Sequence, residues 1–142
     1  MYTPSMTEVT IYTDGGARPT NPGPSGWGFV AIFPDVEYRI SGEEKWSTNN
    51  RMELTAVIEA LLFTAEEPDN WLVFHCDSKY VINCAQNIWK RSKNTDLWEL
   101  YDKALGNRRK PKFVWIKGHS GNKYNEIADS LATESALNAG KC

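Results

Sequence analysis

The stretch Val9-Thr10-Ile11-Tyr12-Thr13-Asp14-Gly15-Gly16 predicts a β-strand that leads directly into a tight turn. Val9 and Ile11 alternate with Thr10 and Tyr12, and such β-branched and aromatic side chains suit a pleated, half-buried surface. The glycine pair permits backbone angles that other residues avoid, so the chain can turn sharply after the strand. A carboxylate held at a strand end can serve metal-dependent chemistry, but Asp-Gly also begins ordinary turns. Taken alone, this stretch favours the ordinary turn.

The bulk composition is that of one globular domain. The chain has 142 residues, of which 41% are hydrophobic and 24% charged, and this length gives no reason to propose two domains. We therefore expect a single domain over residues 1–142, with loose termini at residues 1–7 and 139–142. No apolar run approaches the ~20 residues that cross a bilayer, and the N-terminus lacks the basic and apolar regions of a secretory signal. These features predict a cytoplasmic protein, without a membrane partner and monomeric.

Cysteine content and net charge exclude few classes of function. Three cysteines are an odd number without paired spacing, which indicates neither a disulfide framework nor a zinc site. The net charge of −2 argues weakly against a dedicated nucleic-acid binder, because such proteins are usually basic. Two basic clusters, at residues 90–93 and 108–112, can be read as nucleic-acid contacts or as solvated loops. Net charge therefore leaves the question of a nucleic-acid partner open.

The hydrophobic pattern along the chain predicts an α/β fold. Prolines at positions 19, 22 and 24 exclude residues 17–26 from a helix or a central strand. A first helix opens at residues 48–50, with Asn49 or Asn50 as N-cap, and continues before Pro68. Ile88 completes the apolar stripe of the second helix, and Gly106 closes the third. The expected strands are 27–33, 36–41, 71–76 and 113–116, and the later helices 78–89, 96–105 and 126–138. A three-strand meander followed by βα units predicts a mixed sheet with helices packed on its faces.

Four acidic residues have positions that the predicted fold can bring together. Asp14 and Asp77 each follow an apolar strand, and parallel neighbouring strands would place both at one edge of the sheet, where sites form. Glu53 lies one turn into its helix, and Asp129 lies in the first turns of the last helix. Each acid alone has an ordinary explanation as a turn, dipole, cap or solvated residue. Four converging carboxylates, however, make sense mainly around divalent cations.

Six segments carry a resemblance to a known family. They are Tyr12-Thr13-Asp14-Gly15, Asn21-Pro22-Gly23-Pro24, Thr48-Asn49-Asn50-Arg51-Met52-Glu53-Leu54, Asp77-Ser78-Lys79-Tyr80-Val81, Val114-Trp115-Ile116-Lys117-Gly118-His119-Ser120-Gly121 and Asn125-Glu126-Ile127-Ala128-Asp129-Ser130-Leu131-Ala132. In this order, from residue 8 to residue 136, they resemble the signature blocks of ribonuclease H, type 1. The family has a five-stranded mixed sheet, a three-strand antiparallel meander plus two parallel strands, with helices on both faces. The resemblance implies an endonuclease that cuts the RNA strand of RNA–DNA hybrids and leaves 5′-phosphate and 3′-hydroxyl ends.

The same resemblance assigns catalytic roles to five residues. Two divalent ions ~3.5–4 Å apart activate water and neutralise the leaving oxygen in such sites. Mg²⁺ is the expected ion, two per site, with Mn²⁺ as an alternative. The resemblance places metal ligation and catalysis on Asp14, Glu53, Asp77 and Asp129, with Asp14 as the bridge. It gives His119 proton transfer or help in releasing the cleaved phosphate, against the alternative of a surface histidine without a role.

The RNA–DNA hybrid is the expected partner, recognised by shape through 2′-hydroxyls and phosphates. Candidate substrate-binding residues are Asn21, Asn49, Asn50, Lys79, Lys90 and Lys117. The asparagines can equally serve as turn and cap residues. Lys79 stands where the family often has glutamine, and it can contact phosphate or simply be solvated.

Two further departures from the family pattern affect the residues expected to bind the substrate. The loop from Asp14 to Asn21 is one residue longer than usual, which makes the placement of Asn21 less certain. Many family members carry a basic helix and loop between their third and fourth helices. In this chain that region is shortened or absent, and Lys90, Arg91 and Lys93 are its remnant. This predicts weaker binding with intact catalysis.

Two alternative functions use the same fold. One is a catalytically weak module that only binds hybrids, and the other is a DNA-cutting nuclease of the transposase or integrase type. The complete set of carboxylates argues against the first, and the blocks at residues 48–54 and 117–121 argue against the second.

Overall fold

Between residues 7 and 141, the part of the chain that the computed structural model describes, five strands and four helices follow one another in the predicted order. They are β1 (Glu8–Ala17), β2 (Gly23–Ile32), β3 (Glu37–Ser47), α1 (Asn49–Phe63), β4 (Trp71–Cys76), α2 (Lys79–Ala85), α3 (Thr95–Leu105), β5 (Lys112–Trp115) and α4 (Lys123–Ala139). Of the predicted loose termini, residues 1–6 and 142 lie outside the described part. The carbonyl of Thr7 accepts a hydrogen bond from the Trp71 amide at 2.9 Å. None of the described helices is long and apolar enough to cross a membrane.

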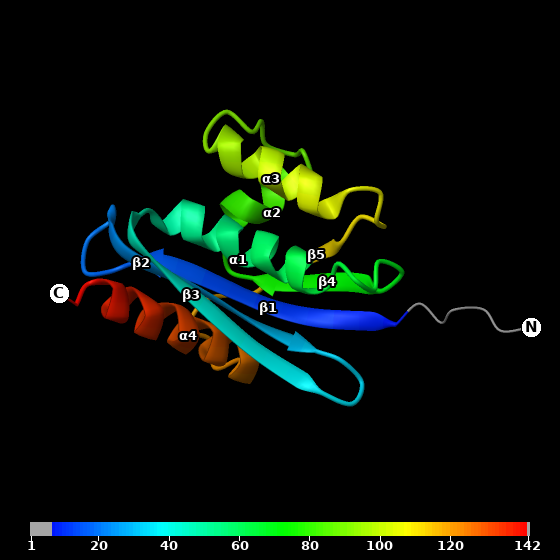
Figure 1. Ribbon diagram of the computed structural model, residues 1–142, viewed down its shortest axis with the longest axis horizontal. Coiled ribbons are helices and arrows are strands. Elements are labelled where there is room, and N and C mark those ends of the chain that lie inside the picture. Colours follow the sequence, from blue (N-terminus) through cyan, green and yellow to red (C-terminus); the bar gives the residue numbers. More distant parts are fainter. Residues whose placement is uncertain (1–6, 142) are drawn as a thin grey trace, which may run out of the picture.

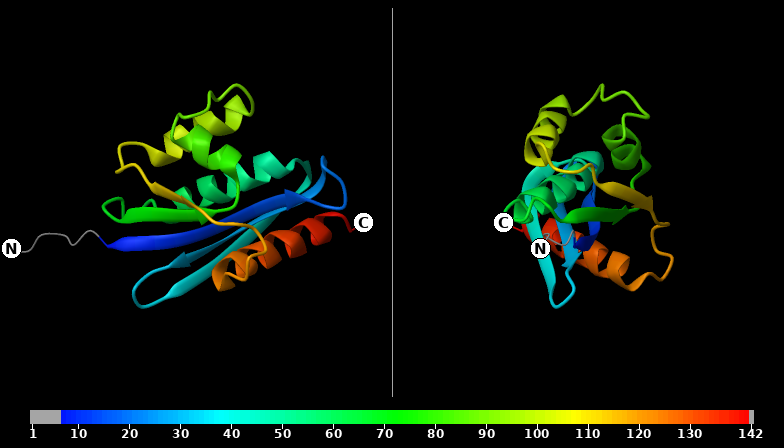
Figure 2. Two further views of the ribbon diagram at one scale, coloured as in Figure 1. Left: turned by 180° about the vertical axis from the view of Figure 1, so that it is seen from behind. Right: turned by 90° about the vertical axis from the view of Figure 1, so that its right-hand side faces the viewer.

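The strands form one mixed sheet in the order β3-β2-β1-β4-β5 (Figure 1). β2 is antiparallel to both β1 and β3, which makes the predicted meander. β4 is parallel to both β1 and β5. Helices α1, α2 and α3 lie on one side of the sheet and α4 lies on the other, as Figure 2 also shows. The predicted α/β fold, with helices on both faces of a five-stranded mixed sheet, is confirmed.

The main core fills the space between the sheet and α1. Val9 and Ile11, alternate residues of β1, are fully buried in one cluster with Leu54 and Leu61 of α1. Alternation along the strand and a spacing of seven along the helix turn these side chains toward the same space. The opposite face of the sheet is covered by a stripe of buried alanines on α4, namely Ala128, Ala132 and Ala136.

The first strand does not stop at Asp14, as the sequence predicts, but continues to Ala17. Gly15 and Gly16 keep pairing with β2, opposite Trp27 and Gly26. The glycines therefore do not make the predicted tight turn. A Cβ atom at Gly15 would lie 2.3 Å from the carbonyl carbon of Met52 in α1. Glycine is required here because helix and strand touch backbone to backbone.

The helix caps also differ from the predicted ones. The N-cap of α1 is Thr48, whose hydroxyl accepts from the Arg51 amide at 3.2 Å, and neither Asn49 nor Asn50 takes this role. Ser78 caps α2 by accepting a hydrogen bond from the Val81 amide at 3.1 Å. The carboxylate of Asp77 therefore does not cap this helix. α4 begins at Lys123 because Asn122 caps it, earlier than the expected start at residue 126.

Three further boundaries move for local reasons. α2 ends at Ala85, and Asn87 has a left-handed backbone with φ of 60°. Ile88 consequently leaves the expected apolar stripe and is 66% exposed. β2 begins at Gly23, inside the expected loop over 17–26, and β3 runs on to Ser47 because the two strands pair over their whole length, with one irregularity.

Both predicted basic clusters contain an arginine that serves the fold. Arg91 donates to the carbonyl of Cys84 at 2.8 Å and pairs with Asp102 at 2.8 Å, which ties α2 to α3. Arg108 donates to the carbonyl of Leu61 at 2.9 Å at the end of α1. These two guanidinium groups are therefore committed to helix packing and not to nucleic acid.

Gly15→Ala is expected to lower the free energy of unfolding by about 2–3 kcal/mol, because the added methyl group forces β1 and α1 apart. Gly16→Ala is the matched control, since its Cβ would meet only the Asn49 side chain at 3.4 Å, and its cost should stay within about 1 kcal/mol. Urea unfolding in EDTA measures both variants. Equal losses in the two would contradict the proposed role of Gly15.

Candidate active site

The candidate site lies at the edge of the sheet where β1 extends past β4. The last parallel pair joins Tyr12 to His75, and β4 ends one residue later at Cys76. Asp14 lies in the part of β1 that extends past β4, and Asp77 follows β4 directly. Because the two strands run in the same direction, their C-terminal ends share an edge, and this is where α/β sheets bind ligands. The structure thus brings the two carboxylates together as the sequence predicts.

Glu53 of α1 joins these two acids through the backbone of Gly15. The Gly15 amide donates a hydrogen bond to Glu53 Oε1 at 2.6 Å, and it lies 2.9 Å from Asp14 Oδ1. One carboxylate oxygen each of Asp14, Glu53 and Asp77 lies within 4.8 Å of the others. The geometry is that of three ligand atoms around a small central space, as a single cation requires.

Burial makes this acid group costly to ionise. Asp14 is only 8% exposed and Glu53 only 9%. Burial raises the pKa of Asp14 to about 7, and the charge of Asp77 adds to the rise. Burial likewise raises the pKa of Glu53 well above its ordinary value, and the charges of Asp14 and Asp77 reinforce the shift. Near neutral pH the two buried carboxyls therefore retain a proton, which a divalent cation can replace.

Asp129 of α4 lines the same pocket, and its carboxyl neighbours that of Asp14, whose pKa it helps to raise. The pocket has a volume of about 470 Å³, and Asp14, Glu53, Asp77 and Asp129 all contribute to its lining. Asp129 is not among the three acids whose oxygens meet within 4.8 Å. Its Oδ1 atom lies 3.6 Å from Nη2 of Arg18. Three of the four predicted acids thus form one tight group, and the fourth, Asp129, lies next to Asp14 but outside that group.

His119 reaches the pocket from the loop between β5 and α4. Its backbone is left-handed, with φ of 56°, and its side chain lines the pocket. The loop closes on itself through a hydrogen bond from Ser120 Oγ to the Lys117 carbonyl at 2.6 Å. A Cβ atom at Gly118 would lie 2.8 Å from Asp77 Oδ2, so glycine lets the loop pack against that acid. The structure thus places His119 beside the carboxylates.

Comparison with known proteins identifies the family. The family model described as RNase H matches residues 6–137. The chain belongs to the RNase H family of enzymes. Ribonuclease H of Hydrogenovibrio crunogenus is 42% identical over 143 residues, which cover 92% of this chain and 96% of that protein. Ribonuclease H of Alcanivorax borkumensis is 44% identical over 140 residues, covering 89% of this chain and 90% of that protein.

Solved structures of the RNase H family have the same fold. The N-terminal RNase H domain of a Mycobacterium tuberculosis protein, solved as a fusion with maltose-binding protein, matches with a TM-score of 0.81 at 25% identity. The match covers 94% of this chain and 96% of that one. LC11-RNase H1, solved in complex with an RNA/DNA hybrid, matches with a TM-score of 0.79 at 27% identity, over 94% and 99% of the two chains.

Two of the predicted substrate-binding asparagines, Asn21 and Asn49, are hydrogen-bonded to each other and form what we call the asparagine rim of this RNase H site. Asn49 and Asn50 line the pocket, whereas Asn21 lies just outside it. The side-chain oxygen of Asn21 accepts from the Asn49 amide at 3.0 Å, and that of Asn49 accepts from the Ala17 amide at 2.7 Å. These bonds hold the loop after β1 against the start of α1. They also fix both side-chain amides, so that each oxygen faces the protein.

The three predicted lysines lie in different places. Lys79 lines the pocket, with its ammonium group 4.7 Å from the centre of the Trp115 ring. Trp115 in turn donates to the Asp77 carbonyl at 3.2 Å. Lys90 and Lys117 are exposed and lie outside the lining of the pocket. The structure therefore brings only Lys79 to the acidic group.

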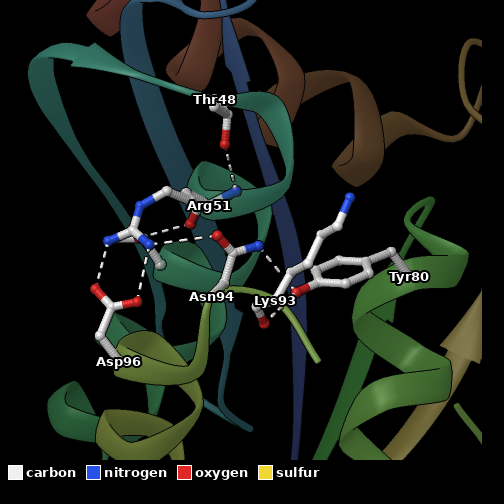
Figure 3. Close-up of polar contacts among 7 residues, drawn as sticks. Thr48, Arg51, Tyr80, Lys93, Asn94 and Asp96 are labelled. Carbon is white, nitrogen blue, oxygen red and sulfur yellow. Dashed lines mark hydrogen bonds and ion pairs between the residues drawn. The ribbon is translucent and has the colours of Figure 1, made fainter. Parts of the chain in front are cut away.

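A polar network links the start of α1 to α2 and to the start of α3, as Figure 3 shows. Arg51 in the first turn of α1 binds both oxygens of Asp96, at 3.0 and 2.7 Å, which lowers the pKa of Asp96 to about 2. Asn94, just before α3, donates to the Tyr80 hydroxyl at 3.0 Å. Tyr80 lines the pocket. The network thereby fixes α2 and α3 against the start of α1, next to the asparagine rim.

Arg18 and Tyr80 are pocket residues that sequence reasoning did not single out as site residues. Arg18 is an isolated basic residue in a proline-rich loop, four positions after Asp14. Its short distance in sequence from Asp14 is the one signal that could have indicated a role at the site. Tyr80 lies in the motif that begins at Asp77, but its position in the predicted helix is equally typical of a core residue.

Proposed function

We propose that this chain is an endonuclease that hydrolyses the RNA strand of RNA–DNA hybrids, leaving 5′-phosphate and 3′-hydroxyl ends. The observation that carries the proposal is the group of Asp14, Glu53 and Asp77 beside Asp129 in one open pocket. Membership of the RNase H family supports the reaction, and the hybrid bound to LC11-RNase H1 supports the substrate. Action as a monomer in the cytoplasm stays a prediction from composition.

The donor set of the pocket fits divalent cations. Its acidic oxygens are hard ligands of the kind that Mg²⁺ prefers, and the buried pair is costly to ionise without a partner of opposite charge. Asp14, Glu53, Asp77 and Asp129 would hold two Mg²⁺ ions, or Mn²⁺ as an alternative. When bound, such ions supply activation of water and relief of charge on the leaving 3′-oxygen.

The protein's own groups orient the carboxylates for this task. The Gly15 amide holds one oxygen of Glu53 and so fixes the direction of that carboxylate. Asp14 has an oxygen within 4.8 Å of oxygens of both Glu53 and Asp77, and the resemblance to the family gives it the role of the ligand that both ions would share. We propose that Glu53 also contacts a ribose 2′-hydroxyl, the group that distinguishes RNA from DNA.

The asparagine rim is suited to hold the hybrid through its backbone and sugars. Among residues 7–141, the side-chain oxygens of Asn21 and Asn49 accept backbone hydrogen bonds, whereas their NH₂ groups donate none. Those donors are therefore presented to the substrate in a fixed direction. Lys79 adds a positive charge at the same pocket, and Lys90 and Lys117 extend it outward. Such contacts read shape and charge rather than base sequence.

The assignment is tested by incubating labelled RNA–DNA hybrid, DNA duplex and RNA duplex with Mg²⁺ or with EDTA. We expect cutting of the RNA strand of the hybrid alone, and only with Mg²⁺. Asp14→Asn should reduce cleavage to the level seen in EDTA, because it removes the bridging charge, while its circular dichroism stays that of the wild type. Cutting of DNA duplex, binding without cutting, or Mg²⁺-dependent cleavage by the variant would each contradict the proposal.

His119 is proposed to transfer a proton or to assist release of the cleaved phosphate. His119→Asn is the suitable variant, because asparagine tolerates the left-handed backbone at this position. Turnover should fall by about a hundredfold, the low end of a general acid–base contribution, with little change in hybrid affinity. Steady-state kinetics against pH measures both quantities. Unchanged turnover would mean that His119 has no role, and complete loss would place it with the carboxylates.

A further inference from the structure

The backbone around Arg18 is fixed at the mouth of the acidic pocket. The Arg18 amide donates to the Pro24 carbonyl at 2.8 Å. The preceding amide, of Ala17, donates to the side chain of Asn49 at 2.7 Å. The side chain of Arg18 lines the pocket and is 47% exposed. Its guanidinium group is therefore tethered beside the acids but free to change its direction.

Arg18 differs from the other arginines in how loosely its charge is held. Each of the other five has a close partner: Arg39 has Glu37, Arg51 has Asp96, Arg91 has Asp102, Arg108 has Leu61 and Thr64, and Arg109 has the Trp71 ring. Within residues 7–141, the Arg18 guanidinium makes no hydrogen bond, and its ion pair with Asp129 spans 3.6 Å. That separation exceeds the usual 2.7–3.2 Å of a hydrogen bond.

Asp129 is the one acid of the four that has an ion pair among residues 7–141. The other three place their oxygens within 4.8 Å of one another, and Asp129 is outside this group. Arg18 therefore supplies the positive charge nearest to Asp129, where a cation would otherwise balance it. A guanidinium group also binds phosphate well, because its planar fork can donate two parallel hydrogen bonds. One loosely held guanidinium thus has two competing anionic partners.

We infer that Arg18 is an exchangeable partner of Asp129 that couples substrate binding to completion of the cation site. In the free protein, the guanidinium balances Asp129 and weakens cation binding there. When a hybrid enters, Arg18 turns to a phosphate of the bound strand, and Asp129 becomes available to a divalent ion. This inference rests on the proposed function, because it requires a substrate phosphate at the pocket.

The first test measures cation binding without nucleic acid. Mg²⁺ and Mn²⁺ are titrated calorimetrically into the wild type, Arg18→Gln, Arg18→Lys and the control Arg39→Gln, which removes the same charge at a residue that does not line the pocket. Arg18→Gln should bind the ion at Asp129 about threefold to tenfold more tightly, since one exposed charge at this distance is removed. Arg18→Lys should remain close to the wild type. The gain should vanish when Asp129→Asn is added to Arg18→Gln.

The second test measures hybrid affinity in EDTA as a function of salt. Arg18→Gln should lower the slope of log affinity against log salt by about 1, the loss of one phosphate contact, and Arg39→Gln should not. If Arg18→Gln matches Arg39→Gln in either titration, the inference is wrong. The first titration contains no hybrid and the second requires no cleavage, so a chain that binds without cutting refutes the proposed function alone. If the wild type cuts the hybrid but Arg18→Gln gives the same two titrations as the wild type, this inference alone is refuted.

Discussion

The hydrogen bond from the Gly15 amide to Glu53 is the contact on which the arrangement of the site depends. It forms because Gly15 has no side chain, so the backbone of α1 at Met52 can lie directly against β1. This approach sets Glu53 beside Asp14 at the point where β1 extends past β4. The parallel pairing of β1 with β4 then adds Asp77 to the same edge. A single missing methyl group therefore determines the distance between acids that are 39 positions apart in sequence.

Bringing these acids together has an electrostatic cost that explains how the pocket works. Burial raises the pKa of both Asp14 and Glu53, so the free pocket holds a proton where it would otherwise hold adjacent negative charges. Holding the acids this close lowers the folding stability of the cation-free protein, but it places the carboxylates in position to bind a cation. Asp129, the more exposed acid, has Arg18 as its neighbour instead. The pocket thus balances its charge in two ways, by a proton at the buried acids and by a guanidinium at the exposed one.

Much of this could be predicted from the sequence, because periodicity and strand ends are local signals. The order of the elements, the mixed sheet and the meeting of Asp14 with Asp77 follow from apolar alternation and from the shared direction of parallel strands. The purpose of Gly15 could not be predicted, since it depends on Met52, which is distant in sequence. The choice of Thr48 over its neighbour Asn49 as cap likewise depends on the loop that Asn49 binds. Side-chain partners such as that of Arg18 are set by tertiary packing, which motif spacing does not encode.

The central claim is that two buried carboxyls hold a proton until a divalent cation replaces it. The most direct measurement is the number of protons released per bound Mg²⁺, obtained by calorimetry in buffers of different ionisation enthalpy across pH 5.5–8.5. Because the pKa of Asp14 lies near 7 and that of Glu53 is also raised, the pair is protonated below that pH and must lose a proton on binding. The account predicts release of about one proton per ion at pH 6, with a decrease as the pH rises through 7. Binding without proton release at pH 6, or no binding at any pH, would contradict it.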